Sequence, residues 1–291
     1  MKTGKLLFDS VKTLRKITSS KNAAFKEAES IILFTLGISR EKLFMMLNHD
    51  ISAVRARGIK NLVKKRARGY PLQYIIEKEN FYLRDFIVKP GVLIPRPDTE
   101  AVIDCVKEAQ KRLKGPVTAA ECGCGSGAIG ITLLKEVKSI KEIYCYDISK
   151  AAAALTRQNA LIHGVKSKMK IYKSDFFSKK RKGRKKFRLV VSNPPYVKTE
   201  DMKKLQPEVK KEPAKALRAG KDGLFYYRKF AGSPGLYLEK GGLLVLEAGD
   251  DMMNKVKKLF AERGWEAVNM AKDFRGRPRA AAFSFPCKKQ K

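Results

Sequence analysis

Histidine, tryptophan and cysteine are scarce in this sequence. Its 291 residues include two histidines, one tryptophan and five cysteines. The cysteine count is odd and no pair has C-x-x-C spacing, so neither a disulfide framework nor a zinc site is indicated. We expect no metal, and we expect a reducing, cytoplasmic environment in which the thiols stay free. The cysteines are Cys105, Cys122, Cys124, Cys145 and Cys287.

Long apolar segments are also missing. No stretch approaches the ~18 apolar residues of a membrane-spanning helix, and the charged N-terminus has no apolar run of signal-peptide length. We therefore expect no membrane association. A hydrophobic content of 44% over 291 residues is still enough for one large core and a smaller domain.

Acidic residues are few relative to basic ones. The chain has 63 Lys and Arg against 29 Asp and Glu, which gives a formal net charge of +34. Such a field favours polyanions, and nonspecific or ribosome-associated RNA is one partner that it predicts. A compositional bias that spreads lysine over every helix surface explains the excess equally well, because the basic residues run along the whole chain.

Apolar spacing divides the chain into three parts. Residues 1–72 have helical periodicity throughout, with Ser39 and Ser52 as helix caps, which predicts a small helical domain. Residues 73–95 are interpreted as a hairpin linker, with strands at 74–76 and 86–88. Residues 96–291 form the third part, and its first helix is expected to be capped by Asp98 or Thr99.

Strand and helix patterns alternate in the third part, which predicts an α/β fold with a doubly wound, mostly parallel, Rossmann-like sheet. Helices are expected at 128–137, 151–163 and 251–263, and a further one within 224–238 that Ser233-Pro234-Gly235 interrupts. Strands are expected at 117–122, 143–147, 169–172, 189–192 and 243–247, and the apolar stretches 267–270 and 280–285 close the chain.

A glycine-rich loop follows the first of these strands. Glycines between a strand and a helix allow positive φ and a close approach of the backbone to a ligand. The second strand ends in Asp147, whose carboxylate can bind both hydroxyls of a ribose. The glycine spacing alone also fits a dinucleotide site. The loop is Glu121-Cys122-Gly123-Cys124-Gly125-Ser126-Gly127.

Three features favour S-adenosylmethionine over NAD as the cofactor. Glu121 precedes the glycines, where a carboxylate can receive the ammonium group of the methionine moiety but would repel a pyrophosphate. Asp175 and Phe176 follow the third strand, where an adenine ring would lie. The fourth strand leads into Asn193-Pro194-Pro195-Tyr196. Two prolines make this loop rigid and rich in acceptors, so that it can hold a planar NH₂ group beneath the Tyr196 ring.

These motifs together resemble the PrmC/HemK type of protein-glutamine N5-methyltransferase, a class I family. The likeness runs from about Pro71 to Arg279, and its most specific string is Ile94-Pro95-Arg96-Pro97-Asp98-Thr99-Glu100 combined with the Asn-Pro-Pro-Tyr loop. The loop alone is shared with adenine-N6 methyltransferases. Glu77 departs from the family, which usually has glycine there.

The resemblance implies methylation of the glutamine in the Gly-Gly-Gln motif of peptide chain release factors, with the helical domain docking this substrate. It implies that Asn193, Pro194 and Tyr196 are catalytic and that Pro195 helps to bind the substrate glutamine. Two alternatives stay open: methylation of a ribosomal protein glutamine, and adenine-N6 methylation of DNA or RNA. The cofactor contacts implied by loop chemistry and resemblance are Glu121, Gly123, Cys124, Gly125, Ser126, Gly127, Asp147, Asp175, Phe176 and Asn193.

Overall fold

The computed structural model describes residues 1–182 and 185–285, so Cys287 lies outside the described residues. The chain forms two compact units. The first comprises Met1–Lys78 and Gln206–Lys211, and the second comprises Glu79–Leu205 and Glu212–Lys291. None of the described helices is both long and apolar enough to cross a membrane.

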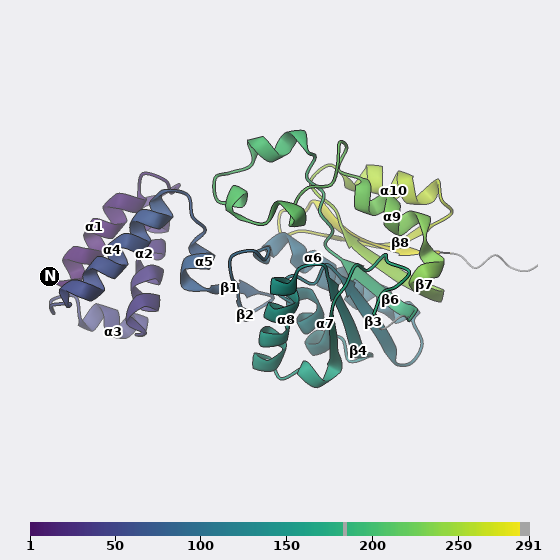
Figure 1. Cartoon of the computed structure of the whole chain (residues 1–291), viewed down its shortest axis with the longest axis horizontal. Coiled ribbons are helices and arrows are strands. Elements are labelled where there is room, and N and C mark those ends of the chain that lie inside the picture. The colour runs from purple at the N-terminus through teal and green to yellow at the C-terminus, as the bar shows by residue number, and fades with distance from the viewer. Residues whose placement is uncertain (183–184, 286–291) are drawn as a thin grey trace, which may run out of the picture. The chain divides into compact units, whose positions relative to one another are not determined.

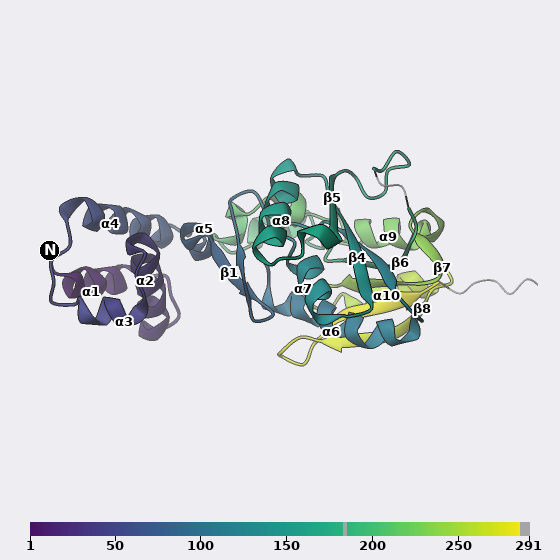
Figure 2. The same ribbon diagram turned by 90° about the horizontal axis from the view of Figure 1, so that it is seen from below.

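The first unit is helical, as its periodicity predicts, and α1, α2 and α4 pack against one another around one apolar core (Figure 2). Ser39 and Ser52 cap α3 and α4, because their hydroxyls accept hydrogen bonds from backbone N–H groups of the first turn. Gly37 ends α2 in the left-handed conformation, at φ 65°. The helices are α1 (Thr3–Leu14), α2 (Lys21–Leu36), α3 (Arg40–Met45), α4 (Ala53–Ala67) and α5 (Leu72–Ile76).

The predicted strand at 74–76 is wrong, because these residues belong to α5. Tyr74 and Ile75 are both buried, and Ile75 joins the core of the first unit, so a helical turn satisfies their burial. Glu77 ends α5 at a φ of 54°. The hairpin starts only at Lys78, with strands β1 (Lys78–Phe81) and β2 (Arg84–Ile87).

The second unit contains a seven-stranded sheet within the described part of the chain, in the order β5-β4-β3-β6-β7-β9-β8 (Figure 1). Strands β5 to β7 pair in parallel, whereas β9 runs antiparallel to both of its neighbours. The doubly wound fold is therefore confirmed. The strands are β3 (Val117–Cys122), β4 (Ile140–Asp147), β5 (Met169–Lys173), β6 (Phe187–Ser192), β7 (Leu238–Glu247), β8 (Glu266–Lys272) and β9 (Pro278–Ser284).

Helices cover both faces of this sheet (Figure 1), so both faces bury apolar side chains. Ala119 and Ala120, neighbours on β3, belong to opposite cores because successive side chains of a strand point to opposite faces. The apolar helix expected within 224–238 ends earlier, at Gly232. The helices are α6 (Glu100–Ala109), α7 (Ala128–Glu136), α8 (Lys150–Ile162), α9 (Phe225–Gly232) and α10 (Met253–Ala261).

Candidate active site

A cavity of about 590 Å³ lies in the second unit, lined by residues that follow the carboxyl ends of β3, β4, β5 and β6. Ligands of doubly wound sheets bind at this edge, where the strand order reverses between β3 and β6. Gly127 and Tyr196 are not among its lining residues. The predicted site residues that do line it are Glu121, Gly123, Cys124, Gly125, Ser126, Asp147, Asp175, Phe176, Asn193, Pro194 and Pro195.

The glycine loop depends on backbone conformations that other residues rarely adopt. Gly123, Gly125 and Gly127 have φ values of 75°, 54° and 83°. A Cβ at Gly127 would lie 2.9 Å from Thr156 Cγ2, so this glycine also lets α7 pack closely against α8. Gly127 therefore contributes to the conformation of the loop and to helix packing but does not line the cavity.

Asp147 ties the end of β4 to the glycine loop. Its Oδ2 accepts a hydrogen bond from the Gly125 N–H at 3.0 Å, and its Oδ1 accepts one from the Ser149 N–H at 2.8 Å. Burial raises the pKa of this carboxyl, while the two backbone N–H groups oppose the shift. The free lone pairs of both oxygens remain suited to a pair of ribose hydroxyls.

Glu121 is a buried acid on the cavity wall, with 1% of its surface exposed. Its Oε2 accepts a hydrogen bond from the Gly130 N–H at 3.1 Å and lies 3.6 Å from Cys145 Sγ. Burial raises the pKa of Glu121 to about 8, despite these two donors. No described Lys or Arg forms an ion pair with Glu121, so this position favours a cationic ligand.

Phe176 and Asp175 both line the cavity, but Phe176 is buried and Asp175 is exposed. Phe176 is 3% exposed and packs edge-on against Tyr146, so most of its ring lies in the core and only part reaches the cavity. Asp175 is exposed, and its Oδ1 accepts a hydrogen bond from the Phe177 N–H. Phe177 also lines the cavity, and sequence reasoning missed it, although it follows Phe176 directly.

The amide of Asn193 is oriented by Thr99. Asn193 lines the cavity, and its Nδ2 donates a hydrogen bond to Thr99 Oγ1 at 3.0 Å, a bond that does not use the amide oxygen Oδ1. Thr99 occupies the N-cap position of α6, as expected, but its side chain makes no capping hydrogen bond. The Thr99 hydroxyl is engaged by Asn193, and Asp98 instead pairs with Arg275 and Arg279.

Tyr196 lies beside the cavity in a tightly packed position. A Cβ on Gly249 would come within 2.8 Å of Tyr196 Cδ2, so only glycine leaves room for the ring. Burial raises the pKa of the Tyr196 hydroxyl, and the nearby Glu247 carboxyl adds to the shift. The ring is therefore packed against the backbone at Gly249.

Sequence reasoning assigned no role to Glu247, the last residue of β7. It is 1% exposed, and neither carboxylate oxygen has a hydrogen-bond partner among the described residues. Burial raises its pKa to about 7, while the Thr99 hydroxyl, Arg279 and the Tyr196 hydroxyl oppose the shift from nearby. The available signal was an acid directly after the apolar run Leu243 to Leu246.

Arg96, which lines the cavity, and Arg279 each form ion pairs with acidic residues of the second unit. Arg96 pairs with the buried Glu212, whose Oε2 also accepts a hydrogen bond from the Ile94 N–H at 3.0 Å. Arg279 is buried and pairs with Asp98 and Asp273. Among the described residues no group of three or more His, Cys, Asp or Glu is placed to hold a metal ion.

Comparisons with known proteins agree with this geometry. Residues 98–234 match the methyltransferase small domain, and residues 11–76 match the PrmC N-terminal domain. A methyltransferase structure from Pyrococcus furiosus is 16% identical and superimposes with a TM-score of 0.51, covering 71% of this chain and 91% of that one. This second likeness shows the fold alone.

Curated relatives are named release factor glutamine methyltransferase. The one from Clostridium acetobutylicum is 33% identical over 89% of this chain and 91% of its own length. The one from Dictyoglomus turgidum is 40% identical over 71% of this chain and 72% of its own length. With both family matches and this coverage, the chain belongs to the release factor glutamine methyltransferase family.

Proposed function

We propose that this protein methylates the side-chain nitrogen of the glutamine in the Gly-Gly-Gln motif of peptide chain release factors. The family to which it belongs supports this substrate. One observation supports the chemistry most directly: Asn193 lines the cavity beside the glycine loop, and its amide nitrogen, not its oxygen, is bound by Thr99. A free, oriented acceptor suits a substrate whose reacting group is an NH₂.

S-adenosylmethionine is the methyl donor, and it supplies an electrophilic methyl group when bound. The residues present fit it. Asp147 has lone pairs free for ribose hydroxyls, and Glu121 is a buried acid that forms no ion pair within residues 1–182 and 185–285, as the ammonium of the methionine moiety requires. The glycine loop allows close approach of the backbone, and Phe176 and Asp175, which line the cavity, would hold the adenine.

The substrate amide needs help because its nitrogen lone pair is delocalised into the carbonyl. Asn193 Oδ1 accepts one N–H of the amide and the Pro194 carbonyl accepts the other, which raises the electron density on nitrogen and fixes its direction. Pro194 and Pro195 have no N–H to compete for these acceptors, and their fixed φ keeps the loop rigid. Tyr196 supports the loop and excludes water.

The substitution Asn193→Ala tests the assignment. We expect methyl transfer to a purified release factor to fall at least ~100-fold, comparable with the loss of one preorganised hydrogen bond at a reacting centre. The affinity for S-adenosylmethionine, measured by calorimetry, should change far less. Asn80→Ala, at an exposed asparagine in β1, is the matched control and should keep full activity.

Turnover of Asn193→Ala within a few-fold of the unaltered protein would overturn this role of the loop. The acceptor is tested separately, by offering labelled S-adenosylmethionine with a release factor, ribosomes, RNA or DNA. Label that enters a ribosomal protein or adenine instead of the release factor would favour the alternative substrates. A release factor whose Gly-Gly-Gln glutamine is replaced by asparagine controls for the methylated position.

A further inference from the structure

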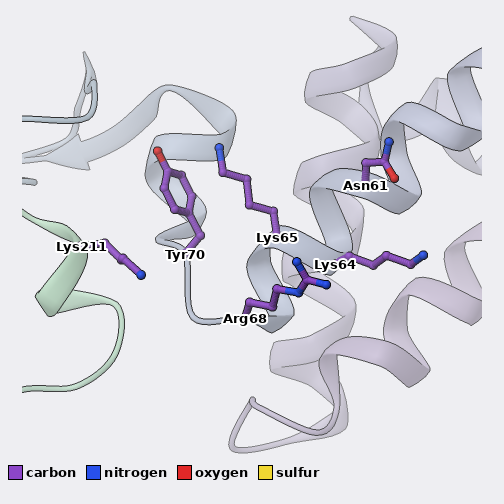
Figure 3. Close-up of a pocket in the computed structure, with 6 residues that line it drawn as sticks. All are labelled: Asn61, Lys64, Lys65, Arg68, Tyr70 and Lys211. Carbon is purple, nitrogen blue, oxygen red and sulfur yellow. The ribbon is translucent and has the colours of Figure 1, made fainter.

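We propose that the first unit binds the phosphate backbone of RNA in a concave, positively charged surface at the end of α4. This surface, called here the basic pocket, has a volume of about 470 Å³ (Figure 3). It lies wholly within the first unit and shares no residue with the methyltransferase cavity. Its lining residues are Asn61, Lys64, Lys65, Arg68, Tyr70 and Lys211.

The spacing of residues on α4 creates one wall of the basic pocket. Ile59 and Val63 are buried in the core of the first unit, so the opposite side of the helix faces solvent. Asn61, Lys64 or Lys65, and Arg68 follow one another at intervals of three and four residues, which places them along that exposed side. The helix contains no acidic residue, and its basic ones are Arg55, Arg57, Lys60, Lys64, Lys65 and Arg66.

A distant segment, Gln206–Lys211, supplies the other wall. Arg66 is buried and binds Glu208 at 2.7 Å as well as Glu27 at 2.8 Å, which joins this segment to α2 and α4. Pro207 packs against Gly69: a Cβ added to Gly69 would lie only 2.9 Å from the Pro207 Cβ. These contacts place Lys211 across the basic pocket from α4 (Figure 3).

The cations of the basic pocket are available to a ligand. Glu27 and Glu208, two acids near the end of α4, are both engaged by Arg66. Lys64, Lys65, Arg68 and Lys211 form no ion pair with any described residue. The Lys65 ammonium lies 3.8 Å from the centre of the Tyr70 ring, which holds the charge near the pocket without neutralising it.

A phosphate backbone fits this surface better than an acidic protein patch. Arg57 and Lys60, both exposed, continue the positive charge along α4, so that the charged strip from Arg57 to Arg68 spans about 16 Å of helix. A nucleic acid strand presents evenly spaced charges over such a length, and mobile lysines bind them as point charges. The net charge of +34 adds long-range attraction for the same class of ligand.

The test compares two triple variants by the anisotropy of a labelled, mixed-sequence, single-stranded RNA of about 20 nucleotides. Lys64→Gln, Lys65→Gln and Lys211→Gln together remove the basic pocket. Lys5→Gln, Lys12→Gln and Lys16→Gln, called here the α1 variant, remove the same charge from exposed positions on α1 and just after it. The dissociation constant is measured from 50 to 300 mM KCl for both variants and for the unaltered protein.

Each lost phosphate contact should reduce the slope of log K against log[salt] by about 0.7, so the pocket variant should lose about 2 and the α1 variant much less. The rate of release factor methylation at saturating substrate should stay unchanged in both variants, because neither touches the cavity. Equal losses in the two variants would overturn the proposal. Unchanged RNA affinity with a raised KM for the release factor would also overturn it, in favour of an acidic protein partner.

Discussion

The buried acid Glu121 makes the stability of the second unit depend on pH in an unusual direction. A carboxyl whose pKa rises on folding keeps its proton in the folded state at a pH where the unfolded chain has lost it. Folding then becomes less favourable as pH rises from about 4.5 towards 8, where burial has placed the pKa of Glu121. The substitution Glu121→Gln removes this titration while keeping the shape of the protonated acid.

The size of the effect follows from the shift. Between about pH 5 and 8 the cofactor-free protein should lose roughly 1.4 kcal/mol of unfolding free energy per pH unit through Glu121 alone. Glu121→Gln should therefore be nearly neutral at pH 5 and stabilise the protein by on the order of 4 kcal/mol at pH 8. Glu247 titrates in the same direction in both proteins, so its contribution cancels in the comparison.

Trp265 gives a direct assay, because it is the single tryptophan of the chain and is buried in the second unit. Its fluorescence during urea unfolding reports the stability of that unit at each pH. Glu266→Gln removes an exposed carboxyl from β8 and controls for the loss of one acidic residue. A Glu121→Gln advantage that does not change between pH 5 and 8 would refute the reasoning.

Two further predictions concern Thr99 and Glu77. Thr99→Val removes the acceptor that orients Asn193, so we expect kcat for methyl transfer to fall about 10-fold while the dissociation constant of S-adenosylmethionine stays unchanged. Thr99→Ser keeps the hydroxyl and should restore the rate. Equal rates for the Val and Ser variants would argue against this role. Glu77→Gly should stabilise the first unit by up to about 1 kcal/mol in urea unfolding followed by circular dichroism, because φ at this position is 54°. Glu77→Ala keeps the Cβ and should bring no such gain.

The sequence predicts the sheet of the second unit well, because its central strands contain short apolar runs bounded by glycine, proline or a polar residue. Val117 to Cys122 is found as expected, and the acids and the asparagine that follow strands meet at one edge. Parallel strands bring their carboxyl ends together, so the order of the chain is enough to gather Glu121, Asp147 and Asn193.

Local sequence patterns do not predict the structure correctly where tertiary contacts determine it. Tyr74 to Ile76 has strand composition, yet the core of the first unit buries two of its side chains as a helical turn. Thr99 is a residue type that commonly caps helices, yet its hydroxyl accepts a hydrogen bond from Asn193, which lies 94 positions later in the chain. The sequence does not assign Glu247 a role, because the lack of hydrogen-bond partners for its carboxylate among the described residues depends on the tertiary structure.

The chain is strongly positive overall, whereas its cavity must bind a cationic cofactor. The chain carries +34 overall, yet the cofactor of the family is a sulfonium cation, which this field repels at long range. Screening limits that repulsion to about 8 Å at physiological ionic strength, so local groups decide the potential inside the site. Glu121 lies opposite Val191 of β6 in the sheet register, one strand from the start of the acceptor loop. A cation bound beside Glu121 would favour loss of its proton, since an opposite charge lowers a carboxyl pKa. The energy that burial of Glu121 costs the free protein is thus available to hold the cofactor's positive charge.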